Sequence, residues 1–144
     1  MKPVAACQGR GIFLTRDWEN IDMKPGEQYV VQRYMHKPYL IDNLKFDMRI
    51  YCLVYGVDPL RVFVFREGLA RFATEEYLGP YRNNLDNLYM HLTNYAINKN
   101  SENFEANEDS AEDDCGHKRS VSSIFKYIEE NETESGVTAN KLWE

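Results

Sequence analysis

Apolar and polar residues alternate most strictly in the stretch FDMRIYCLVY, from Phe46 to Tyr55. Successive side chains of a strand point to opposite faces, so this pattern predicts a strand with Phe46 on one face and Asp47 on the other. We expect Leu53 and Tyr55 to pack as ordinary core residues on the Asp47 face. A turn at GVDPLR and one or two strands in RVFVFREGLARFAT should follow, which together predict an antiparallel meander.

Weaker patterns predict the remaining elements. MKPVAACQGRGIFL reads as strand, turn and strand, and YVVQRYM reads as a further strand because it is rich in β-branched and aromatic residues. YLGPYRNN is typical of a loop, and LDNLYMHLTNYAINKN mixes apolar and amide residues without a clean period. SVSSIFKYIEEN places Val121, Ile124, Phe125 and Ile128 at helical spacing, with Ser120 as the expected N-cap.

The net charge of −6 is concentrated in one segment of the chain. Seven carboxylates lie between Glu102 and Asp114, and no Lys or Arg interrupts them. We expect residues 101–117 to form a mobile acidic insertion within one partial domain covering residues 1–144. A chain without a broadly basic surface is not typical of a nucleic-acid-binding protein, so no nucleic-acid partner is expected.

The cysteines and the hydropathy exclude several classes. Three widely spaced cysteines fit a reducing compartment better than a disulfide framework, and no spacing of Cys or His indicates zinc. No run of 18 apolar residues is present, so no membrane association is expected.

Lys45, Asp47 and Arg49 share one face of the predicted strand. An unpaired buried charge costs on the order of several kcal/mol. A structural network in which these three charges pair with one another is therefore one interpretation. A platform for a nucleotide is the other, because a cation can hold phosphate while a carboxylate orients it. The pattern alone leaves both open.

Four other stretches carry groups suited to a ligand. CQGRGI has glycines in a turn, where backbone N–H groups can approach phosphate oxygens, and QRYMHKP has a glutamine beside an aromatic residue. HLTNYAINK gathers a hydroxyl, an amide, a phenol and a lysine. Arg71 interrupts EGLARFAT where an apolar residue would have sufficed. Each has an ordinary structural interpretation when taken singly.

Together these stretches resemble the tubulin tyrosine ligase-like family, and within it the polyglutamylase branch. The motifs that carry the resemblance lie in order along most of the chain: KP at 2–3, CQGRGI at 7–12, QRYMHKPYLID at 32–42, KFDMRIYCLV at 45–54, DPLRVFVFREGLARFAT at 58–74 and HLTNYAINK at 91–99. KFDMRIY with HLTNYAINK looks more like glutamylases than like the tyrosine ligase or the glycylases.

The resemblance implies an α+β fold with an ATP-grasp-like antiparallel sheet and flanking helices. It also implies that the fold is incomplete, containing the central and part of the C-terminal subdomain. Family members use ATP to phosphorylate the γ-carboxylate of a glutamate in a tubulin tail, and the amine of free glutamate then attacks this acyl phosphate. Such an enzyme must neutralise phosphoryl charge and bring two anions together.

The resemblance also assigns candidate residues. For ATP the matching positions are Lys2, Gln8, Gly9, Gln32, Arg33, Tyr34, Met35, Lys45, Phe46, Asp47, Thr93 and Asn94. For the incoming glutamate they are Gln8, Arg71, Tyr95 and Lys118. An arginine suits a carboxylate because its planar fork pairs with two oxygens. Lys118 in GHKRS equally fits an exposed basic side chain with no further role.

The chain also departs from the family pattern. VAA follows Lys2 where the family usually has an acidic residue and small polar ones, and the family's N-terminal domain is missing. The family's distal segment, in which an aspartate and an E-x-N pair hold magnesium, is not matched as a segment, so we expect the magnesium ligands outside this chain and assign no metal ligand within it. These 144 residues alone should therefore show little or no ligase activity.

Three functions follow from these expectations. The first is a piece of an ATP-dependent tubulin polyglutamylase, with tubulin, microtubules and free glutamate as partners. Its expected location is the cytoplasm and cytoskeleton, including a cilium or basal body. The second is a catalytically incomplete remnant that binds tubulin or regulates. The third is a ligase that uses another amino acid, such as glycine.

Overall fold

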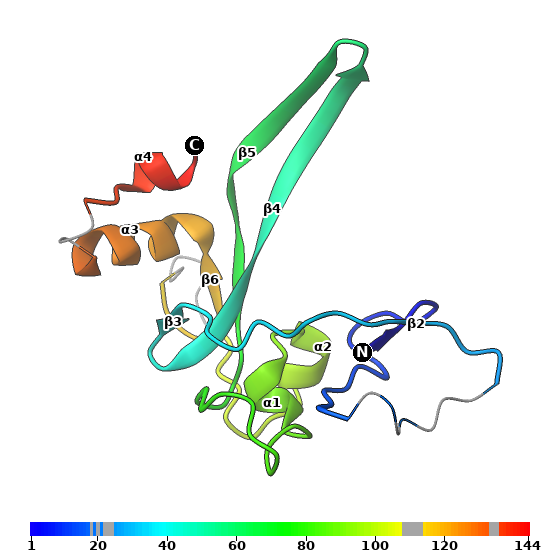
Figure 1. Ribbon diagram of the computed structural model, residues 1–144. Coiled ribbons are helices and arrows are strands. Elements are labelled where there is room, and N and C mark those ends of the chain that lie inside the picture. The colour runs from blue at the N-terminus through cyan, green and yellow to red at the C-terminus, as the bar shows by residue number, and fades with distance from the viewer. Residues whose placement is uncertain (18, 20, 22–24, 108–113, 133–135) are drawn as a thin grey trace. The chain divides into compact units, whose positions relative to one another are not determined.

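The computed structural model describes residues 1–17, 19, 21, 25–107, 114–132 and 136–144 (Figure 1). The chain divides into two compact units, each built from two stretches of sequence. Unit 1 contains residues 1–46 and 72–104, and unit 2 contains residues 47–71 and 105–144. Strands and helices are both present, which confirms the predicted α+β class.

The strands form two antiparallel sheets. β1 (Lys2–Pro3) pairs with β2 (Tyr29–Val30). The second sheet has the order β3-β4-β5-β6, formed by β3 (Leu40–Ile41), β4 (Leu44–Val57), β5 (Leu60–Phe72) and β6 (Lys118–Ser120). Since each strand neighbours the next along the chain, the predicted meander is confirmed, although the two short outer strands, β3 and β6, were not predicted.

Four helices complete the described part of the chain: α1 (Leu88–His91), α2 (Tyr95–Asn98), α3 (Val121–Asn131) and α4 (Ala139–Leu142). The prediction of α3 is confirmed together with its N-cap, because the side chain of Ser120 accepts a hydrogen bond from the backbone N–H of Ser123 at 2.9 Å. α1 and α2 are one turn each, which explains why their sequence shows no helical period.

Each unit has its own apolar core. In unit 1 the ring of Phe46 stacks on the buried ring of Phe72 with centroids 5.2 Å apart, and Ile41 and Met90 are also buried. In unit 2 the buried side chains of Val121 and Ile124 belong to α3, which packs against β6 and α4.

Two strand predictions near the N-terminus are wrong in extent. Ile12–Leu14 form no strand, although Phe13 exchanges hydrogen bonds with Met1: the Met1 amino group donates to the Phe13 carbonyl at 2.7 Å and the Phe13 N–H donates to the Met1 carbonyl at 3.1 Å. Of YVVQRYM only Tyr29–Val30 is a strand. Propensity favoured longer strands here, but β1 offers a partner of only two residues.

The expected packing of the outer hairpin is also wrong. Leu53 is 63% exposed and Tyr55 is 71% exposed. The sheet explains this difference: β3 pairs with β4 only at Leu44 and Lys45, while β6 pairs with β5 only from Leu69 to Arg71. Among the described residues, no other strand covers the edges of the hairpin beyond these positions.

The predicted acidic insertion at 101–117 falls partly outside the described residues, which omit 108–113, so its mobility stays a prediction. The residues on either side of this gap are tied together. The N–H of Glu105 donates to Nδ1 of His117 at 3.0 Å, and the amide of Asn107 donates to the carbonyl of Cys115 at 3.1 Å.

Replacement of the N-cap gives a test of α3. We expect Ser120→Ala to lower the free energy of unfolding by about 1 kcal/mol, because the N–H of Ser123 loses its acceptor. Ser120→Asp, which keeps an acceptor at this position, should unfold close to wild type. Urea unfolding of the full chain, followed by circular dichroism, measures both variants, and equal stability of the alanine and aspartate variants would contradict the capping role.

Candidate functional site

Unit 1 contains a hollow of about 800 Å³. Six of the residues predicted to bind ATP line it: Lys2, Gln32, Arg33, Tyr34, Met35 and Lys45. They come from β1, from the extended segment that follows β2, and from the start of β4, so strands far apart in the sequence supply one concave surface. This volume lies in the range of pockets that take small molecules.

The hollow is cationic. Four of its lining side chains, those of Lys2, Arg16, Arg33 and Lys45, are lysine or arginine, and none of the described lining residues is Asp or Glu. Val30, Val31 and Leu92 are among its apolar lining residues. A hollow with cations and apolar walls suits a ligand with an anionic part and a planar or apolar part.

Lys45 is held in a defined position at this hollow. Its Nζ donates to the carbonyl of His91 at 2.8 Å and to the hydroxyl of Tyr34 at 3.1 Å, and it lies 4.4 Å from the centroid of the Tyr34 ring. The Tyr34 hydroxyl in turn lies 2.9 Å from Nδ1 of His91, and Nε2 of His91 lies 2.9 Å from the carbonyl of Asn84. The Asn84 carbonyl requires a donor, so His91 carries its proton on Nε2 and accepts from Tyr34.

Burial keeps the two aromatic partners of Lys45 neutral. It lowers the pKa of His91, and the positive charge of Lys45 lowers it further. Burial also raises the pKa of the Tyr34 hydroxyl above its usual value, as does hydrogen bonding with Tyr77. Lys45 is therefore the cation of this group, and the two rings fix its position.

The turn predicted to lie beneath phosphates packs on α2. Gln8 and Gly9 both have positive φ, 59° and 84°. The φ of Gly9 favours glycine, and a Cβ there would lie 2.5 Å from Cδ1 of Ile97 and 3.3 Å from Cγ of Asn94, so the turn packs closely on α2. The structure thus brings Gly9 and Asn94 together, two residues that were predicted separately. Gln8, Gly9, Thr93 and Asn94 are not among the residues that line the hollow.

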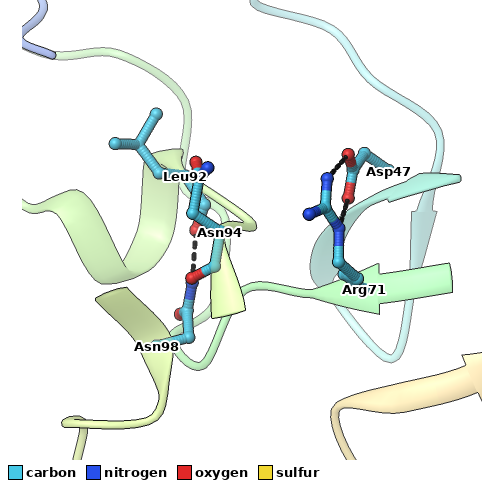
Figure 2. Close-up of polar contacts among 5 residues, drawn as sticks. All are labelled: Asp47, Arg71, Leu92, Asn94 and Asn98. Carbon is cyan, nitrogen blue, oxygen red and sulfur yellow. Dashed lines mark hydrogen bonds and ion pairs between the residues drawn. The ribbon is translucent and has the colours of Figure 1, made fainter. Parts of the chain in front are cut away.

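Asn98 organises the loop before α2, and the sequence analysis missed it. Its side chain is buried, and Oδ1 accepts from the N–H of Thr74 at 3.0 Å and from its hydroxyl at 2.9 Å. Nδ2 donates to the carbonyls of Leu92 at 2.7 Å and Asn94 at 3.2 Å (Figure 2). These contacts hold the backbone on both sides of Thr93. No distinct sequence signal marks Asn98, because it is one of several amides in this segment.

Unit 2 contains the predicted arginine and lysine of the glutamate site. Arg71 binds both carboxylate oxygens of Asp47 through Nε, at 2.9 Å to Oδ1, and through Nη2 (Figure 2). This hydrogen bond and the charge of Asp47 raise the pKa of Arg71. Lys118 of β6 is the register partner of Arg71, so their side chains share one face of the sheet.

The structure therefore changes the interpretation of the charged strand. Asp47 pairs with Arg71 of β5, in place of the network of Lys45, Asp47 and Arg49 considered from the sequence. Lys45 belongs to unit 1 and Asp47 to unit 2, so the alternation alone could not assign their partners.

The other predicted residues lie elsewhere. Gln8 and Tyr95 are exposed in unit 1, with the Tyr95 ring 5.8 Å from that of Phe104. Phe46 packs in the core against Phe72.

The described residues contain no group of three or more His, Cys, Asp or Glu side chains that could hold a metal ion. They therefore form no magnesium site built from protein carboxylates alone. In nucleotide sites magnesium is usually bound by one or two carboxylates together with waters and substrate phosphates. Within the same described part of the chain, every helix is too short or too polar to cross a membrane.

Comparison with known proteins gives a consistent result. A model of the tubulin-tyrosine ligase family matches residues 1–143. A probable beta-tubulin polyglutamylase of Tetrahymena thermophila is 54% identical over 143 residues, which cover 99% of this chain and 12% of that protein. The human tubulin polyglutamylase TTLL13 is 51% identical over 142 residues, covering 99% of this chain and 16% of the relative. The tubulin polyglutamylase TTLL7 of Xenopus tropicalis is 41% identical over 143 residues, covering 99% and 15%.

Replacing the buried amide of Asn98 by a carboxylate tests its hydrogen-bonding role. We expect Asn98→Asp to lower the free energy of unfolding at pH 7 by about 2–4 kcal/mol, because a carboxylate oxygen would face the carbonyls of Leu92 and Asn94. Protonation restores one donor, so the pKa of the new carboxyl is raised in the folded state and the loss should shrink as pH falls. Unfolding at pH 7 and pH 4 measures this change.

Asn98→Ala serves as the control, because it cannot titrate. Its loss of stability relative to wild type should be the same at both pH values. A pH-independent loss in the aspartate variant would contradict the assignment of Nδ2 as the donor to the two carbonyls.

The lowered pKa of His91 predicts a pH dependence. Because the folded pKa lies below the unfolded value of about 6.5, the stabilisation is complete above that value and is lost as pH falls toward the folded pKa. The advantage of wild type over His91→Gln in free energy of unfolding should therefore shrink between pH 7.5 and pH 5. The pKa of His117 is also lowered by burial, but His117 is present in both proteins, so its effect cancels. A difference that stays constant with pH would contradict the prediction.

Proposed function

Because this chain belongs to the tubulin-tyrosine ligase family, we propose that it is part of an ATP-dependent ligase that adds glutamate to γ-carboxylates of glutamates in tubulin tails. The chain spans 12% to 17% of the length of curated relatives that match nearly all of it. The observation that carries the proposal is the cationic hollow of unit 1, which occurs in a chain 54% identical to a protein named as a probable polyglutamylase.

The hollow is the proposed ATP site. Lys2 and Lys45 would face phosphate oxygens, and the extended segment Gln32–Met35 would hold the base, largely through backbone groups. Lys45 needs little reorganisation on binding, because Tyr34 and the carbonyl of His91 already fix its ammonium. Gln8, Gly9, Phe46, Asp47, Thr93 and Asn94 remain proposed contacts on the evidence of the family motifs.

Within unit 2, Arg71 and Lys118 are the proposed glutamate contacts; Gln8 and Tyr95 remain proposals that rest on the family motifs alone. Two cations on one face of the sheet suit a donor with two carboxylates, whereas glycine carries only one. Asp47 uses two of the five N–H donors of Arg71 and thereby fixes the plane of the guanidinium. This charge pattern favours glutamate over glycine as the amino acid added.

The chemistry follows from these roles. ATP supplies the phosphoryl group that activates the acceptor γ-carboxylate toward the amine of glutamate. The chain's own residues would supply the charges that these reactants need: cations of the hollow would neutralise phosphate charge, and Arg71 with Lys118 would hold the carboxylates of the donor. Magnesium is proposed to take its protein ligands from outside the described residues.

The partners follow from the same proposal. We propose tubulin and microtubules as the acceptor and free glutamate as the donor, because the relatives are named as tubulin polyglutamylases. The proposed location is accordingly the cytoskeleton, including cilia. The carboxylates from Glu102 to Asp114 would repel an acidic tubulin tail, so tail binding is proposed to involve basic residues elsewhere.

The full-length protein with labelled glutamate, ATP and tubulin tests the proposal. We expect label in tubulin, and we expect Lys2→Met to weaken ATP binding by about tenfold or more, since a charge-assisted contact to phosphate is lost. Lys37→Met is the matched control, because Lys37 is equally exposed but does not line the hollow. Calorimetry with ATP measures both variants. Unlabelled tubulin, or equal ATP affinity of the two variants, would contradict the proposed function.

A further inference from the structure

Glu67 of β5 makes four hydrogen bonds around the start of α3. Its Oε1 accepts from the backbone N–H groups of Gly68 at 2.8 Å, Val121 at 3.1 Å and Ser122 at 3.3 Å. Its Oε2 accepts from the hydroxyl of Ser122 at 2.6 Å. One carboxylate therefore joins β5 to the first residues of a helix that lies more than 50 positions later in the sequence.

The negative charge of Glu67 also stabilises the N-terminus of α3. The first N–H groups of a helix have no partner within the helix, and a negative charge at this end is favourable. Glu67 and the Ser120 side chain between them accept from three of these groups, those of Val121, Ser122 and Ser123. Burial alone would raise the pKa of Glu67, but the hydrogen bonds from Ser122, Gly68 and Val121 lower it, so the side chain stays ionised.

The position of α3 sets the position of Lys118. β6 is only three residues long and continues directly into α3. Its register against β5 pairs Leu69 with Ser120, Ala70 with Arg119 and Arg71 with Lys118. Three pairs form only a short ladder. Glu67 accepts hydrogen bonds from Val121 and Ser122, which directly follow β6, and so holds the end of β6 in place. The carboxylate therefore fixes which residue of β6 lies opposite Arg71.

Close packing limits alternatives to this register. A Cβ at Gly68 would lie 2.3 Å from the carbonyl oxygen of Arg49 and 3.1 Å from Cγ2 of Val121. β5 is thus pressed between β4 and the start of α3 at the residue next to Glu67. A shift of β6 by one residue would turn Lys118 to the opposite face of the sheet from Arg71.

We propose that Glu67 is a positioning residue for the amino-acid substrate: it holds Lys118 opposite Arg71 and so sets the spacing of the two cations that bind the carboxylates of glutamate. This proposal rests on the proposed function. Glu67 itself does not touch the substrate. It acts through the N-terminus of α3 and the register of β6, while Asp47 orients Arg71 from the other side.

Steady-state kinetics of the full-length protein separate this role from a general effect on stability. We expect Glu67→Ala to raise the KM for glutamate by about fivefold to tenfold while the KM for ATP changes by less than about twofold, because none of the hydrogen bonds of Glu67 reaches a residue that lines the hollow. Glu67→Gln keeps an acceptor oxygen and should recover much of the affinity. Ser122→Ala removes only the contact to Oε2 and should have the smallest effect.

Two further variants bracket the result. Glu130→Ala is the matched control. Glu130 is an exposed carboxylate of α3 that pairs with Lys126, four residues earlier. It should leave both KM values unchanged. Lys118→Ala should raise the KM for glutamate by itself, and adding Glu67→Ala to it should raise that KM little further, because the two residues act through one contact.

The outcomes are distinguishable. An active wild type whose Glu67→Ala and Glu67→Gln variants keep the wild-type KM for glutamate overturns the positioning role and leaves the proposed function intact. Equal increases in both KM values, or a fall in kcat alone, also overturn it, since a merely structural role acts on both substrates or on the active fraction. A wild type that incorporates no glutamate overturns the proposed function, and the positioning role with it.

Discussion

The fixed ammonium of Lys45 is the contact on which the hollow of unit 1 depends. A cation near several others must be held against their repulsion, and here a carbonyl, a phenol and the face of an aromatic ring hold it. The same contacts join β4 to the segment before β3 and to the end of α1, because Tyr34 and His91 come from those elements. The contacts that position Lys45 for a ligand therefore also hold three segments of unit 1 together.

In unit 2, carboxylates position two neighbouring cations. Arg71 and Lys118 lie opposite one another on neighbouring strands, and two like charges in that position would destabilise the pair unless a carboxylate intervenes. Asp47 supplies that charge to Arg71, and Glu67 supplies another at the start of α3. Asp47 therefore positions Arg71 directly, and Glu67 positions Lys118 indirectly through the start of α3.

The sequence predicted those parts of the fold whose signals are local. Strict alternation identified β4, and a helical period with a serine before it identified α3 and its cap. β3 and β6 escaped because strands of two or three residues show no period and exist only through their partners. The ordered motifs predicted six residues that line one hollow, but the partner of Asp47 and the role of Asn98 depend on contacts between residues 24 positions apart in each case. Such pairings cannot be read from spacing.

The outer part of the β4–β5 hairpin presents apolar side chains, among them Tyr55, Phe63 and Phe65, to solvent. Its backbone beyond the short ladders with β3 and β6 carries open edges within the described residues. A strand with open edges and exposed apolar side chains can pair with further strands. In a concentrated solution of these 144 residues, such strands belong to neighbouring molecules. We therefore expect these residues to self-associate through this ribbon when handled by themselves, and a charged residue placed at its tip should reduce that association.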